Sequence, residues 1–183
     1  MPFTHLKPIV LVVASNGYQP IEYEVPRNFL QKEGWNVITA SDQAGIAVAS
    51  NKSTTSVDLM VSEINLVDYN GIFFIGGSGA LKCLDNQISY DLIMKAHDLG
   101  VPYGAICISP RILAKAGALR WRHATGWNED KKLEQIFAQN DATYEPVPVV
   151  IDGKIVTAED PKAAEQFAQA ILRVVTDYSV AVD

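Results

Sequence analysis

The chain has 183 residues, 48% of them hydrophobic, with a formal net charge of −6 at pH 7 and a pI near 5.0. This length allows one sizeable buried core, so we expect a single globular domain over residues 1–183. The acidic balance argues against nucleic acids and anionic membranes as partners, because both bind clustered lysine and arginine. The expected partner is a small molecule or another protein.

The sequence also has no recognisable targeting or membrane-spanning segment. No N-terminal run shows the basic, apolar and small-residue order of a signal peptide, and no apolar stretch approaches about 20 residues. We therefore expect a cytoplasmic protein. Its two cysteines, Cys83 and Cys107, are expected to be free thiols, since a reducing compartment does not maintain a disulfide.

Strand-like and helix-like segments alternate in the first half of the chain. The apolar, β-branched run PIVLVVA is typical of a strand covered on both faces in a parallel sheet. In the helix that follows, Pro20 suits the first turn, Pro26 should introduce a kink and Gly34 provides the stop. The expected elements are a strand at 8–14, a helix at 20–33, a strand at 36–40, and short strands or a hairpin at 46–50 and 55–61.

The second half continues this alternation. Asp152 and Gly153 lie between two β-branched runs, which is a strong hairpin signal, and apolar residues near the C-terminus recur at helical spacing. The expected elements are a buried strand at 71–77, a helix at 79–100 with a break near 85–86, a strand at 101–107, a helix at 108–115, a hairpin at 147–159 and a helix at 161–175. Alternating strands and helices predict a three-layer α/β sandwich with a mainly parallel sheet.

Cys107 lies where one of these strands is expected to turn sharply into the next helix. Ligands of open parallel sheets bind beyond the carboxyl ends of the strands, and this thiol falls at that edge. The first N–H groups and the dipole of the helix favour the thiolate, so we expect the thiol pKa to be lowered from about 8.5. The simpler interpretation is a cysteine that packs as a small hydrophobe, and we assign it to Cys83, which lies within a helical pattern.

A pair of glycines should reach the same edge of the sheet. Gly76 and Gly77 follow a buried strand, where missing side chains let the backbone approach a ligand and direct N–H groups at developing negative charge. Together with the N–H of Ile108, they predict an oxyanion hole beside Cys107. Two glycines alone would also suit any tight turn, so the prediction depends on the convergence of the strand ends.

Glu22 is the acidic group expected at this site. It follows Ile21 on the apolar side of the first helix, whereas Glu24, two positions on, points elsewhere and is expected on the surface. If Glu22 lies beside Cys107, the two groups cannot both ionise cheaply and their protons belong to the pair. A protonated Glu22 that donates to a Cys107 thiolate resolves this conflict and makes Glu22 a candidate general acid or base.

Three segments carry a resemblance to a known family: AICISPRILAKAGAL around the cysteine, IGG before it and GYQPIEYEVP near the start. Through them the sequence resembles the ThiJ/PfpI family of the class I glutamine amidotransferase-like superfamily, which includes intracellular proteases, deglycases, glyoxalase III-type enzymes and isonitrile hydratases. The resemblance covers nearly the whole chain. It implies a flavodoxin-like fold with a cysteine elbow, a homodimer or larger assembly, Cys107 as the nucleophile, Glu22 as its acidic partner, and Gly76, Gly77 and the Ile108 amide around the oxyanion.

One departure from the family motif argues against peptide hydrolysis as the reaction. PfpI-type proteases carry a histidine directly after the cysteine, whereas this chain has Ile108, so amide hydrolysis loses its usual base. The deglycase-like branch places a histidine near the segment RHATGWNED, where the equivalent position holds Trp127 and His123 lies four residues earlier. The preferred interpretation of His123 is a surface or packing role, with a catalytic role as the alternative. Scattered histidines and the lack of Cys-x-x-Cys spacing predict no metal site, and no cofactor is expected.

These features predict a cysteine-dependent enzyme that acts on small electrophiles, with glyoxalase-like or deglycase-like chemistry, because an aldehyde carbonyl needs less activation than an amide. Isonitrile hydration is an alternative in which Trp127 walls an apolar pocket. A non-catalytic redox sensor or stress-protective protein that uses an oxidisable Cys107 is a different class of function. Peptidase activity ranks lowest because of Ile108, and a scaffold without turnover is a further alternative.

Overall fold

The computed structural model describes residues 6–182 and is built on a seven-stranded sheet. Six neighbouring strands run parallel, and the edge strand β11 runs antiparallel to β12. In spatial order the strands are β11 (Val149–Asp152), β12 (Ile155–Ala158), β8 (Tyr103–Ile106), β7 (Gly71–Phe74), β1 (Ile9–Val13), β3 (Val37–Ser41) and β6 (Leu59–Met60). This arrangement confirms the mainly parallel sheet.

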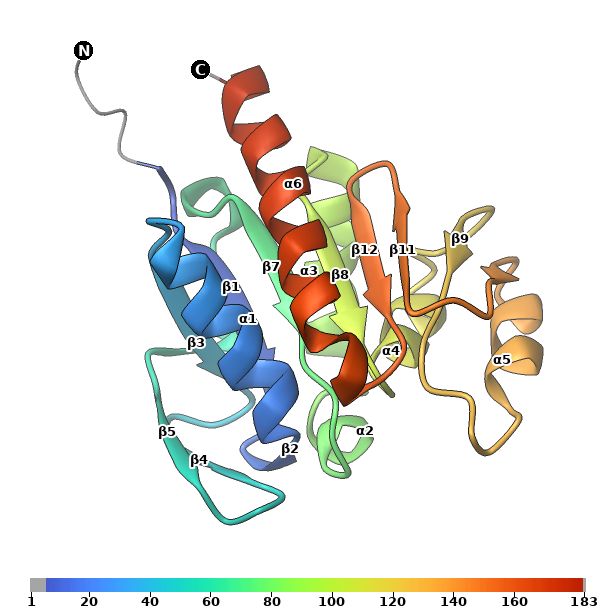
Figure 1. The fold of residues 1–183 in the computed structure, drawn as a ribbon, viewed down its shortest axis with the longest axis horizontal. Coiled ribbons are helices and arrows are strands. Elements are labelled where there is room, and N and C mark those ends of the chain that lie inside the picture. The colour runs from blue at the N-terminus through green and yellow to red at the C-terminus, as the bar shows by residue number, and fades with distance from the viewer. Residues whose placement is uncertain (1–5, 183) are drawn as a thin grey trace.

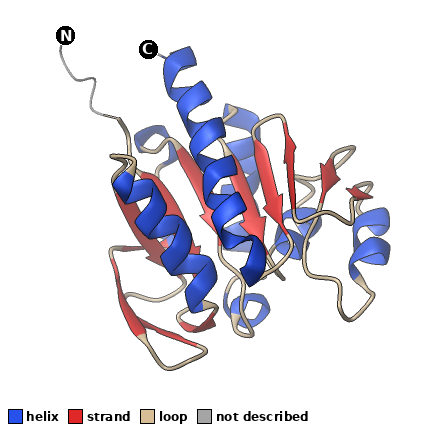
Figure 2. Ribbon diagram, in the orientation of Figure 1, coloured by secondary structure: helices blue, strands red, loops and turns tan. Residues whose placement is uncertain are grey.

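Helices cover both faces of the sheet and complete the predicted three layers. The helices are α1 (Pro20–Lys32), α2 (Ala80–Cys83), α3 (Gln87–Leu99), α4 (Pro110–Lys115), α5 (Leu133–Gln139) and α6 (Ala164–Val182). α1 and α6 lie side by side on one face, with α3 and α4 on the other (Figure 1). Figure 2 shows the strands enclosed between these two helical layers. Within residues 6–182, no helix combines the length and the apolar character that a membrane span requires.

The ends of the helices follow their local sequence. The Gln19 side chain caps α1 by accepting the N–H of Ile21 at 3.1 Å, and Pro20 occupies the first turn as expected. The predicted break near residues 85–86 separates α2 from α3, where the Asn86 side chain caps the new helix. The last helix continues to Val182, beyond the predicted end at residue 175.

Short strands form two smaller sheets that the sequence pattern predicts only in part. They are β2 (Asn16–Tyr18), β4 (Gly45–Ala49) and β5 (Thr54–Val57) in one sheet and β9 (His123–Ala124) and β10 (Thr143–Tyr144) in the other. The segment expected as one strand at 55–61 divides between β5 and β6 at Asp58. Asp58 donates its N–H to the Thr39 carbonyl and accepts the Thr39 N–H through its side chain, both at 2.8 Å. These two bonds fix the chain where it crosses from the small sheet to the large one.

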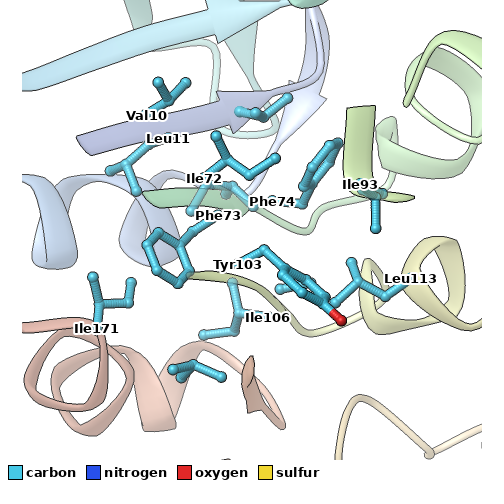
Figure 3. Close-up of a cluster of buried hydrophobic side chains, with 14 of the residues drawn as sticks. Val10, Leu11, Ile72, Phe73, Phe74, Ile93, Tyr103, Ile106, Leu113 and Ile171 are labelled. Carbon is cyan, nitrogen blue, oxygen red and sulfur yellow. The ribbon is translucent and has the colours of Figure 1, made fainter. Parts of the chain in front are cut away.

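The core lies on both sides of β1, β7 and β8. Every residue of these strands is buried, as the continuous apolar runs predict. Alternating side chains enter opposite layers, with Phe73 on the side of α6 near Ile171 and Phe74 on the side of α3 near Ile93 (Figure 3). The Phe73 ring meets Phe167 edge to face, with centroids 6.2 Å apart. This packing holds the carboxyl ends of the strands in place.

Replacement of Phe73 by alanine should destabilise the protein by about 3–5 kcal/mol, because it leaves a cavity between the sheet and α6. Urea unfolding followed by circular dichroism measures this change. The control is Val180→Ala on the same helix, where the side chain is 75% exposed and the expected change is within about 0.5 kcal/mol. Equal losses in the two variants would contradict the proposed core.

Candidate active site

Cys107 lies at a strained elbow between β8 and α4. Its φ of 65° is in the left-handed region, which residues other than glycine seldom adopt and which clusters at functional sites. Backbone bonds hold the elbow on both sides, since Cys107 donates its N–H to the Ala158 carbonyl at 3.0 Å and accepts the Trp127 N–H at 2.8 Å. The Ser109 hydroxyl donates to the Ile75 carbonyl at 2.8 Å and ties the start of α4 to the end of β7. The thiol is therefore presented at the carboxyl edge of the sheet.

Glu22 reaches this thiol from α1. Its side chain is fully buried, and Oε2 accepts the Gly76 N–H at 2.9 Å. A Cβ atom at Gly76 would lie 2.6 Å from both Cys107 Cβ and Glu22 Oε2, so only glycine leaves room for the carboxyl group to lie against the cysteine. The other carboxyl oxygen, Oε1, has no hydrogen-bond partner among the described residues.

The backbone N–H groups of Gly77 and Ile108 interact with the Cys107 sulfur and favour its negative charge. Gly77 has a φ of 117°, and a side chain there would collide with the turn before α1, 2.4 Å from the Gly17 carbonyl oxygen. The Gly76 N–H, in contrast, is used by Glu22. The structure thus brings together the residues that the sequence selected, namely Glu22, Gly76, Gly77, Cys107 and Ile108. The two glycines differ in their contacts, since the Gly77 N–H interacts with the sulfur and the Gly76 N–H with the carboxyl group.

The thiol pKa is the clearest correction to the sequence-based expectation. Burial raises the pKa of Cys107, and the negative charge of Glu22 and its hydrogen bond to the thiol raise it further. The N–H groups of Ile108 and Gly77 lower it, as expected from the helix start, but they do not prevail. Together these effects favour the protonated form of the thiol.

Glu22 is the group of this pair that titrates near neutral pH. Burial raises its pKa from 4.5 to about 7, and the charge of Asp160 acts in the same direction. The contacts with Cys107 and the Gly76 N–H favour the carboxylate and oppose this shift. The pair therefore loses its first proton near pH 7.

Cys107 and Glu22 open into a pocket of about 330 Å³, called the inner pocket below. Its lining residues are Gln19, Glu22, Gly77, Cys107, Trp127, Glu129, Asp160, Pro161 and Lys162. Sequence reasoning did not select the five lining residues Gln19, Glu129, Asp160, Pro161 and Lys162. Three of them follow β12, and their position could have been inferred by placing that strand beside β8, since both strands end at the same edge.

Trp127 forms one wall of the inner pocket and is held by Arg111. The guanidinium carbon of Arg111 lies 5.5 Å from the centroid of the indole ring, and its Nη2 donates to the Trp127 carbonyl at 3.3 Å. The same nitrogen forms an ion pair with Asp130 at 2.7 Å, which lowers the pKa of that carboxyl. Arg111 thus joins the helix after the cysteine to the loop that covers the pocket.

The remaining candidates lie away from this pocket. His123 is exposed in β9, where its Nδ1 lies 2.6 Å from Glu145 Oε1, and it does not line the inner pocket. This position fits the surface role and not the catalytic one. Cys83 lies 3.8 Å from the Ser15 hydroxyl in a different pocket, and both cysteines are free thiols.

Comparisons with known proteins agree on one family. The model of the DJ-1/PfpI family matches residues 7–174. A deglycase from Pyrococcus abyssi is 29% identical over 152 residues, which are 83% of this chain and 90% of that protein. An uncharacterised protein from Archaeoglobus fulgidus is 28% identical over 169 residues, which are 92% of this chain and 99% of that protein.

Solved structures show the same fold. A ThiJ/PfpI domain protein from Brachyspira murdochii has a TM-score of 0.88 at 25% identity, covering 94% of this chain and 98% of its own. DJ-1beta from Drosophila melanogaster has a TM-score of 0.80 at 21% identity, covering 97% of each chain. The second likeness concerns the fold alone.

The raised pKa of Glu22 predicts a distinct pH dependence of stability. The native state binds the Glu22 proton more tightly than the unfolded chain, so the free energy of unfolding should fall as pH rises from 4.5 to about 7. In Glu22→Gln this loss of about 3 kcal/mol should be absent. Compared with the wild type at the same pH, the variant should therefore be more stable at pH 8 than it is at pH 4. Urea unfolding at a series of pH values measures the difference. Glu24→Gln, exposed on the same helix, should follow the wild-type curve; a wild-type curve parallel to that of Glu22→Gln would refute the shift.

The Arg111 contacts predict a second measurable difference. Arg111→Met should cost about 1–3 kcal/mol of unfolding free energy, because it removes a hydrogen-bonded charge whose side chain is only 7% exposed. Arg120→Met is a matched control, since Arg120 also stacks on a tryptophan and pairs with an aspartate but is 60% exposed. Its cost should be below about 1 kcal/mol. Equal costs from denaturant unfolding would argue against Arg111 as the residue that fixes the pocket wall.

Proposed function

Because the chain belongs to the DJ-1/PfpI family, with deglycase-named relatives, we propose that it is a cysteine-dependent enzyme for small carbonyl compounds, with glyoxalase-like or deglycase-like chemistry. One observation carries the proposal: a fully buried glutamate, with a pKa near 7, lies against a thiol at the base of an open pocket. A group that titrates near the working pH is suited to accept and return protons.

In the proposed first step, Cys107 Sγ bonds to the carbonyl carbon and the thiol proton passes to the Glu22 carboxylate. The carbonyl π electrons move to oxygen, and the N–H groups of Gly77 and Ile108 stabilise the negative charge there. Return of the proton from Glu22 to this oxygen gives a neutral thiohemiacetal. Glu22 is then ionised again and can act as a base in the next step.

The pocket supports a small carbonyl substrate and not a peptide. Its volume of about 330 Å³ suits a small molecule, and Ile108 replaces the histidine of the peptidase branch. No histidine is among the residues that line the inner pocket. A peptide amide needs a protonated leaving nitrogen, and the histidine that usually supplies this proton is missing from the lining.

A redox sensor is the second candidate function, and one specific feature favours it. Cys107 is only partly buried, and the N–H groups that interact with its sulfur would equally stabilise the anionic oxygens of a sulfinate. Mild peroxide treatment followed by intact mass tests this role. Selective gain of two oxygens at Cys107, without turnover of carbonyl substrates, would favour the sensor over the enzyme.

The enzyme proposal predicts consumption of methylglyoxal by the purified protein, with kcat/KM rising as pH passes about 7, because the reaction requires the singly deprotonated Glu22–Cys107 pair. Cys107→Ser and Glu22→Gln should each lower kcat/KM by at least about 100-fold. Cys83→Ser is the control and should keep the wild-type rate. Full activity in Cys107→Ser, or no turnover of aldehydes by the wild type, would refute the proposal.

A further inference from the structure

A second cavity, called the outer cavity below, shares part of its lining with the inner pocket. This outer cavity has a volume of about 180 Å³ and is lined by Trp127, Asn128, Glu129, Tyr144, Glu159 and Asp160. Three of these residues also line the inner pocket, namely Trp127, Glu129 and Asp160. A ligand that spans both spaces would have one end at the Cys107 thiol and the other end in the outer cavity.

The charge of the outer cavity is strongly one-sided. Its lining holds the carboxylates of Glu129, Glu159 and Asp160 and no lysine or arginine. Lys162, the one cation among the lining residues, borders the inner pocket and not the outer cavity. Arg111, which stacks on Trp127, does not offset this charge because its guanidinium is paired with Asp130.

Two aromatic rings complete the cavity wall. Trp127 comes from the loop after β9 and Tyr144 from β10, and aromatic faces attract ammonium and guanidinium groups through their negative quadrupole. Glu22 adds a further carboxyl group at the Cys107 end, because it lines the inner pocket but not the outer cavity. The carboxylates and the aromatic rings both favour a ligand that carries positive charge and hydrogen-bond donors.

We propose that the outer cavity is a subsite for an organic cation, so that the substrate of Cys107 is an electrophile that also bears an ammonium or guanidinium group. The inference rests on the proposed function and narrows its substrate class. A bare metal ion is a poorer occupant, because no group of three or more ligand side chains in the described part of the chain is placed to hold one. An anionic carbonyl compound would meet three carboxylates and is disfavoured.

The test compares two thiol reagents of opposite charge on the full-length protein. Trimethylammonium-ethyl and sulfonatoethyl methanethiosulfonate both form a disulfide with Cys107, releasing methanesulfinate, and peptide mass spectrometry gives each rate. Each rate is divided by the rate of the same reagent with free 2-mercaptoethanol, which corrects for the different intrinsic reactivity of the two reagents. Cys107 should show a normalised cation-to-anion ratio about tenfold above that of Cys83, and the ratio should fall with added salt.

Variants assign this preference to the outer cavity. The double variant Glu129→Gln/Glu159→Gln should lower the ratio at Cys107 about tenfold. The control is the double variant Glu24→Gln/Glu33→Gln, which changes the net charge by the same amount. Glu24 is exposed on α1 and Glu33 is exposed at its C-terminal end, so this variant should leave the ratio at Cys107 unchanged. Equal ratios at the two cysteines, equal effects of the two double variants, or no reaction of Cys107 with either reagent would overturn the inference.

The reagents report charge selection without requiring turnover. A cation preference that depends on Glu129 and Glu159, found in a protein that consumes no carbonyl substrate, would support the subsite while refuting the proposed reaction. Turnover of methylglyoxal without any charge preference would support the reaction and overturn the subsite. The two proposals can therefore fail separately.

Discussion

The structure depends on one costly contact, the burial of the Glu22 carboxyl group against Cys107. Burying an ionisable group that has one N–H donor and no paired cation is unfavourable, and the raised pKa of Glu22 is the measure of that cost. The cost is offset by the core of β1, β7 and β8, whose residues are all buried. Gly76 makes the contact sterically feasible, since a side chain at that position would occupy the space between the two groups.

This contact also decides which electrostatic effect controls the thiol. A cysteine at the start of a helix is expected to have a lowered pKa, and the N–H groups of Ile108 and Gly77 do act in that direction. Burial and the Glu22 charge outweigh them. When Glu22 is protonated, its charge no longer opposes the thiolate, so the state of the sulfur follows the state of the carboxyl group. The two residues therefore behave as one titrating unit and not as a reactive thiol with a spectator acid.

Local sequence signals were sufficient for the base of the site but not for its walls. The elbow at Cys107, the burial of Glu22 and the Gly76–Gly77 turn follow from apolar runs, helical spacing and glycine placement, which act over a few residues. Glu129 and Asp160 follow Cys107 by 22 and 53 positions in the chain and reach the pocket through separate loops. Their convergence depends on how β12 and the segment after Gly126 pack against the rest of the protein. The sign of the Cys107 pKa shift depends on burial and on interatomic distances, which no residue pattern contains.

The charges around the pocket connect ligand binding to the chemistry of the pair. Asp160 lines both cavities and contributes to the raised pKa of Glu22 through its negative charge. A cation held in the outer cavity would partly cancel that field, lower the pKa of Glu22 and increase its ionised fraction near neutral pH. In the proposed reaction, the carboxylate is the form of Glu22 that accepts the proton from Cys107. Occupation of the outer cavity by the charged end of a substrate would therefore prepare the base that its reactive end requires.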